Sequence, residues 1–134
     1  MRLPHTITLY NRVKDVDGTE SYIRSKISGV MYSTKIVAEI NNGVTVNKAV
    51  LKIIIPKSNT LRGKYVTPKE YSKMSTANRV DLFTLEKNTL VFKGDVKVTE
   101  TDIAVIKQKY EVYTIYGVDD FDTTSLAHWN VYAS

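Results

Sequence analysis

The sequence contains no cysteine, which excludes disulfide frameworks, thiolate metal sites and cysteine nucleophiles. No apolar run approaches the roughly 20 residues that a membrane-spanning helix needs. The longest such run, residues 50–55, is interrupted by Lys52. The N-terminal segment also lacks the apolar core of a signal peptide. We therefore expect a protein that folds in a reducing cytoplasm and does not associate with membranes.

Recognisable catalytic motifs are absent as well. There is no nucleophile elbow, Walker loop or dinucleotide fingerprint, and His5 and His128 are the only histidines. Asp119, Asp120 and Asp122 could offer oxygen ligands to a cation, but they lack the spacing and the closing Glu of a calcium loop. A turn between two strands is the favoured interpretation of this cluster. The sequence therefore predicts a non-enzymatic protein without metal or cofactor.

The composition is that of an ordinary folded domain. Hydrophobic residues make up 43% of the 134 residues and charged residues 25%. This length can bury a core without cross-links. We expect one domain over residues 1–134.

Alternation of apolar and polar residues dominates the chain and indicates β-strands. Residues 15–19 and 41–43 contain the Asp-Gly and Asn-Gly pairs typical of hairpin turns, and Gly29 is a candidate bulge. Strands are expected at these segments: 6–10, 22–27, 30–40, 49–55, 82–85, 89–92, 112–116 and 128–132. The cluster Asp119–Asp122 is expected in the loop between the last two.

Two short helices are predicted among these strands. Thr67 and Pro68 form an N-cap followed by proline at the first helical position, and Glu70 completes a capping box. Residues 99–102 precede apolar positions spaced three and four apart, which indicates a helix from Ile103. Seven or eight short strands with two short helices predict a mainly β fold, namely a small antiparallel β-barrel or sandwich.

Charge is distributed unevenly along the chain. Residues 1–80 hold 14 Lys/Arg against 5 Asp/Glu, whereas residues 81–134 hold 5 against 9. Solvated surface explains this equally well as a basic side that meets an acidic partner, nucleic acid or a second copy. An extended basic loop is expected at about 57–66, and its cations Lys57, Arg62 and Lys64 are candidates for non-specific contact with DNA phosphates.

The second half resembles small proteins encoded in the head-to-tail region of tailed-phage and prophage genomes of Gram-positive bacteria. The resemblance covers residues 48–134 and depends on the order of five short segments. These are Tyr65–Tyr71, Phe83–Leu85, Leu90–Gly94, Tyr113–Ile115 and Leu126–Val131. Within that group the chain is most similar to the head-closure, or stopper, proteins.

This resemblance implies a homo-oligomeric ring of six- or twelve-fold symmetry in the virion neck, assembled in the host cytoplasm. The ring would join the portal and adaptor to tail proteins and help to retain DNA. The loop with Lys57, Arg62 and Lys64 could then line the channel. Two alternatives stay open: a tail terminator, tail-completion or tail-tube subunit, and a small nucleic-acid-binding β-barrel.

Overall fold

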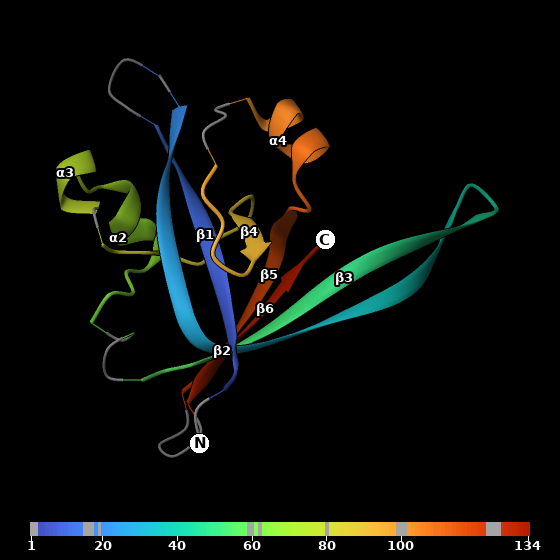
Figure 1. The fold of residues 1–134 in the computed structure, drawn as a ribbon, viewed down its shortest axis with the longest axis horizontal. Coiled ribbons are helices and arrows are strands. Elements are labelled where there is room, and N and C mark those ends of the chain that lie inside the picture. The colour runs from blue at the N-terminus through green and yellow to red at the C-terminus, as the bar shows by residue number, and fades with distance from the viewer. Residues whose placement is uncertain are drawn as a thin grey trace.

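The computed structural model describes residues 3–14, 18, 20–58, 61, 63–79, 81–98, 102–122 and 127–134. The strands are β1 (His5–Lys14), β2 (Glu20–Asn41), β3 (Val44–Pro56), β4 (Leu90–Lys93), β5 (Tyr113–Phe121) and β6 (His128–Ala133). The helices are α2 (Pro68–Ser72), α3 (Thr76–Arg79) and α4 (Ile103–Lys109). Figure 1 shows the helices beside the sheet and a long hairpin that leaves it.

The strands form one antiparallel sheet that closes on itself in the order β1-β2-β3-β6-β5-β4. The predicted mainly β class is therefore confirmed. The expectation of separate strands at 22–27 and 30–40 was wrong, because both belong to β2. Gly29 has a φ of +78° and stands at the register shift between β1 and β2, so this bulge bends the strand without ending it.

The β2–β3 hairpin extends well beyond the closed sheet. Its turn is Asn42-Gly43, and both residues have positive φ, 51° and 78°. Such values are typical of a two-residue turn that matches the twist of the flanking strands. We call residues 33–50 the arm; in Figure 1 it projects away from the rest of the chain.

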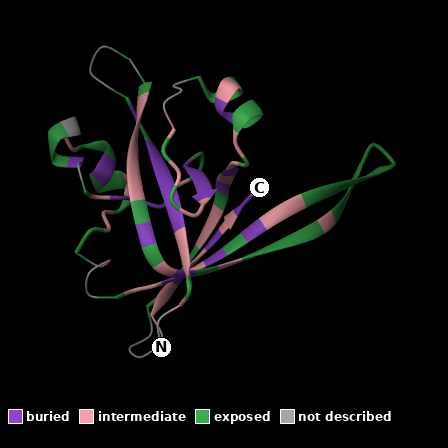
Figure 2. Cartoon of the chain, in the orientation of Figure 1, coloured by how far each residue is buried: buried purple, intermediate pink, exposed green. Residues whose placement is uncertain are grey.

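The core fills the closed sheet. Its largest cluster combines residues from several strands with Phe83 and Leu85, and Trp129 packs against Phe83 and Tyr65. A second, smaller cluster joins Tyr10, Leu90, Phe92 and Ile106, which fixes α4 against the sheet. Most buried residues therefore lie in the closed sheet and under α4, with Tyr71 of α2 and Arg79 of α3 also buried, while the arm is mostly exposed (Figure 2).

Both predicted helices are present, and the predicted cap at Thr67 is confirmed. The Thr67 hydroxyl accepts a bond from the Glu70 amide at 3.4 Å, with Pro68 at the helix start. The Asp102 carboxylate caps α4 by accepting from the Ala104 amide at 2.9 Å. Helix α3 was not predicted.

Two local expectations are corrected. Asp119 and Asp120 belong to β5, since the strand continues to Phe121 and pairs with β6 along its length. Residues 82–85 form no regular strand; Phe83 makes an isolated parallel bridge with Tyr65. Within the described residues, no helix is long and apolar enough to cross a membrane.

Candidate assembly surface and basic segment

The two faces of the arm differ in composition. Cross-strand pairing places Ile36 opposite Ala49, Ala38 opposite Asn47 and Ile40 opposite Thr45. The same face continues toward the sheet through Leu51 and Ile53, both fully buried. We call it the inner face of the arm. The inner face carries no charged residue. The uncharged face of the core strands thus continues along the arm, where the described residues leave Ile36 and Ile40 exposed.

The largest exposed apolar side chains of the arm lie on this inner face, although Val44 on the outer face is also 61% exposed. Ile36 is 64% exposed and Ile40 is 77% exposed, against 0% for Leu51. Burying a side chain of this size stabilises a protein by roughly 1.5–3 kcal/mol. Contiguous apolar surface with such exposure is typical of an interaction site.

The outer face of the arm is mixed in character. Lys35 and Lys48 alternate there with valines, and Glu39 lies opposite Val46. The Lys48 ammonium lies 5.8 Å from the centre of the Tyr116 ring on β5, which joins the root of the arm to the closed sheet.

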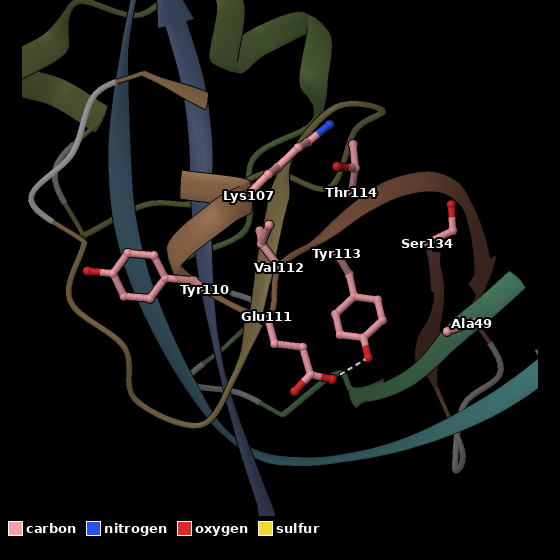
Figure 3. Close-up of a pocket in the computed structure, with 8 residues that line it drawn as sticks. All are labelled: Ala49, Lys107, Tyr110, Glu111, Val112, Tyr113, Thr114 and Ser134. Atoms are coloured by element: carbon pink, nitrogen blue, oxygen red, sulfur yellow. Dashed lines mark hydrogen bonds between the residues drawn. The ribbon is translucent and has the colours of Figure 1, made fainter. Parts of the chain in front are cut away.

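A shallow cleft lies between the arm root and α4 (Figure 3). Ala49 borders it on the arm side, and Tyr110 and Tyr113 border it on the other. The Tyr113 hydroxyl donates to Glu111 at 2.7 Å; this bond, with the nearby Lys93 ammonium, lowers the pKa of Glu111. The cleft therefore offers aromatic rings and one ionised carboxylate.

Lys57, the first predicted DNA-contacting cation, is held against the protein. Its side chain is only 7% exposed and its ammonium forms an ion pair with Asp120, with a second to Asp122 at 3.4 Å. The ammonium also lies 5.0 Å from the centre of the Trp129 ring. Burial acts to lower the pKa of Lys57, but the two aspartates outweigh it and the pKa is raised. Lys57 thus anchors the start of the basic segment to β5 and β6.

The remaining candidates differ in position. Lys64 is exposed, and it lines a small surface hollow together with Arg24, Lys26 and Asp81. Arg24 and Lys26 both pair with Asp95. Arg62 lies outside the described residues. Lys57 is thus buried and paired, whereas Lys64 is exposed. Arg24 and Lys26 of β2 lie beside Lys64 and were not predicted from the sequence.

The described residues hold no group of three or more His, Asp or Glu side chains arranged as a metal site. His5 stacks on Tyr32, and its Nδ1 accepts from the Tyr32 amide at 3.1 Å. His128 stacks on Phe121. Both histidines therefore pack against aromatic rings.

Residues 3–134 match the model of a protein family described as "Family of unknown function (DUF6751)". The chain belongs to this family. No curated protein and no solved structure matches the chain. Membership extends over nearly the whole sequence, so the arm, α4 and the basic segment all lie within the family match.

The arm is the feature that sequence reasoning missed. Strands were expected on both sides of Asn42-Gly43, but their projection beyond the sheet was not. One signal was available in the sequence: residues 33–48 alternate in polarity without large aromatic side chains, and only Lys35, Glu39 and Lys48 are charged. The exposure of the arm depends on where β1 stops pairing with β2 and where β6 stops pairing with β3, and the sequence does not show these points.

Proposed function

We propose that this chain is a non-enzymatic structural subunit of a tailed-phage neck. Copies would form a ring that joins the portal and adaptor to the tail and helps to retain DNA. The observation that carries this proposal is the arm, whose uncharged inner face leaves Ile36 and Ile40 exposed. An arm of this kind gains stability when another protein covers it.

The physical case for assembly is independent of the resemblance. A projecting two-stranded ribbon buries little surface of its own and is marginal in isolation. Here Lys48 contacts Tyr116 near the root of the ribbon, and a partner that covers the tip would stabilise it further. The neck position and the six- or twelve-fold symmetry come from the similarity of residues 48–134 to head-closure proteins.

Retention of DNA is assigned to the exposed part of the basic segment. Lys64 is exposed and lines one hollow with Arg24 and Lys26, which also pair with Asp95, so Lys64 is the main candidate for phosphate contact in this region. Repetition of Lys64 around a ring would multiply weak phosphate contacts. Lys57 contributes indirectly, because its ammonium is held by Asp120 and Asp122.

The two alternatives predict other behaviour. A tail terminator, tail-completion or tail-tube subunit would use the same arm but lie farther from the head. A nucleic-acid-binding barrel would bind DNA as an isolated chain, with an affinity that falls steeply as salt is raised. The exposed inner face of the arm favours assembly over this last alternative, since phosphate contacts need no uncharged apolar face.

Deletion of the gene, followed by electron microscopy of the particles released, tests the proposal. We expect DNA-packaged heads that lose their DNA and free tails that fail to join them. Complementation with a chain carrying Lys64→Ser and Arg62→Ser should restore joining but leave heads that leak. Normal, infectious particles from the deletion strain would contradict the proposal, and tube-length defects would favour a tail subunit.

A further inference from the structure

The arm has two open strand edges. Pairing of β1 with β2 ends at His5 and Val30, and pairing of β6 with β3 begins at Leu51. Residues 33–41 of β2 and 44–50 of β3 therefore pair only with each other in the described structure. Their outward amides and carbonyls are available to another strand.

The closed sheet has a matching open edge on β5. Strand β4 pairs with β5 only at Tyr113 and Thr114, and residues 88 and 89 bond the backbone of Ile115. From Tyr116 to Phe121, the described residues supply backbone partners only from β6. Tyr116 is 47% exposed and Phe121 is 41% exposed, so apolar rings flank both ends of this edge.

Charge favours contact between the arm as a whole and the β5 edge. The arm and its root carry Lys35 on β2 and Lys48 and Lys52 on β3 against one acid, Glu39 on β2, so the positive excess lies on the β3 strand. The β5 edge and the residue after it carry Asp119, Asp120 and Asp122, of which Asp120 and Asp122 are shared with Lys57. The uneven charge along the sequence therefore places a positive excess on the arm and its root and a negative excess on the β5 edge.

We propose that the β2 edge of the arm, residues 33–41, pairs with the β5 edge, residues 116–121, of a second copy of this chain. This inference rests on the proposed function and names the contact that builds the ring. The β2 edge is chosen because it is the longer of the two and because Lys48 places the β3 side close to the arm's own barrel. Strand addition supplies backbone hydrogen bonds, and the inner face supplies apolar contact.

A second copy fits the available surface. The arm projects away from its own sheet in Figure 1, so another chain can meet it without rearrangement. Nine strand residues extend about 30 Å, and a two-stranded ribbon about 10 Å wide offers roughly 300 Å² on each face. Covering the inner face buries roughly 300 Å² of the arm, and the paired edge with the exposed β5 rings must supply the rest of the roughly 800 Å² per partner of a stable interface. Each copy donates one arm and receives one, which is the head-to-tail contact that closes a ring.

Cysteine cross-linking tests this contact cleanly, because the native chain has no cysteine. Two single variants are mixed: Glu39→Cys on the arm and Gly117→Cys on β5. A side-chain carbon at Gly117 meets only the Tyr132 ring, at an ordinary 3.8 Å, so the second variant retains its fold. Lys87→Cys, an exposed turn position, is the matched control for Gly117→Cys, and Lys107→Cys reports on the cleft beside α4.

A short bis-maleimide is added to each mixture under conditions of assembly. We expect Glu39→Cys to cross-link to Gly117→Cys with a yield about tenfold above the Lys87→Cys control, because docking raises the effective concentration of the two thiols. Rings that form without this cross-link, or that cross-link mainly to Lys107→Cys, overturn the proposed contact and leave the ring function standing. Mixtures that stay monomeric at every concentration, with assembly absent in particles too, overturn both.

Discussion

Thr34 of β2 lies opposite the buried Leu51 of β3, and the next pair on the same face is Ile36 opposite Ala49. Along this face the exposure differs between the two strands: on β3 Leu51 is 0% exposed and Ala49 still packs against the core, whereas on β2 Thr34 and Ile36 are already exposed. The backbone pairing does not change at this point. The boundary between barrel and arm is therefore set by the absence of neighbouring strands, and it separates residues that stabilise the fold from residues that are free to bind.

Two isoleucines on the same face test that boundary. Ile53→Ala removes a fully buried side chain and should lower the free energy of unfolding by about 2–4 kcal/mol. Ile36→Ala, on the arm, should change it by no more than about 0.5 kcal/mol. Urea unfolding of both variants measures the difference. Equal losses would mean that the arm is part of the cooperative core.

The inner face of the arm should be needed for assembly but not for folding. The double variant Ile36→Ser and Ile40→Ser should retain its unfolding midpoint and lose oligomers by mass photometry or in particles. Val46→Ser, on the outer face and 43% exposed, is the matched control and should assemble normally. Equal loss of assembly in both would remove the distinction between the two faces.

Lys57 should contribute mainly to the stability of the fold. Lys57→Met keeps the stem over Trp129 but removes the ammonium that pairs with Asp120 and Asp122, and it should cost about 1–2 kcal/mol. The exposed Lys64→Met should cost no more than about 0.5 kcal/mol. Denaturant titration at pH 7 compares the two variants.

The pH dependence of this contact has a defined sign. The pKa of Lys57 is raised in the folded chain, above its ordinary value of 10.5. Its stabilisation is therefore fully present below pH 10.5 and is lost as the pH rises through the folded pKa. The stability gap between the native chain and Lys57→Met should stay constant from neutral pH and shrink only above that value. A gap that closes near pH 7 would contradict the ion pair.

Glu86 gives a second pH test, in which the charged side chain lowers the stability of the fold, whereas the charged side chain of Lys57 raises it. Burial raises the pKa of Glu86 above its ordinary value of 4.5, although the nearby Arg79 opposes this. A raised carboxyl pKa favours the folded state below the unfolded pKa, and this advantage is lost as the pH rises through the folded value. Glu86→Gln should therefore stabilise the chain by roughly 0.5 kcal/mol at pH 7 and have no effect at pH 3. Destabilisation at pH 7 would show that the carboxylate has a partner.

Local chemistry made part of this fold predictable. The Asn42-Gly43 turn, the bulge at Gly29, the cap at Thr67 and the helix from Ile103 each depend on a few adjacent residues, and the structure confirms them. The mainly β class followed from the same local patterns.

Long-range contacts decided the rest. Asp119 and Asp120 were expected in a turn because aspartate favours turns, yet pairing with β6 extends β5 through them. Lys57 was expected in an extended basic loop as a candidate contact to DNA phosphates, but Asp120 and Trp129, both distant in sequence, hold it in place. The arm was invisible for the same reason, since the sequence does not show where β1 and β6 stop.

Cryo-electron microscopy of the particle neck, reconstructed with its own symmetry, shows whether this chain forms a neck ring through its arm. We expect a ring of this chain between the portal-adaptor complex and the tail, with each arm lying on the next copy along residues 116–121. Density for the chain elsewhere in the tail, or its absence from purified particles, would contradict the neck assignment. A ring in which the arms contact no neighbouring copy would contradict assembly through the arm.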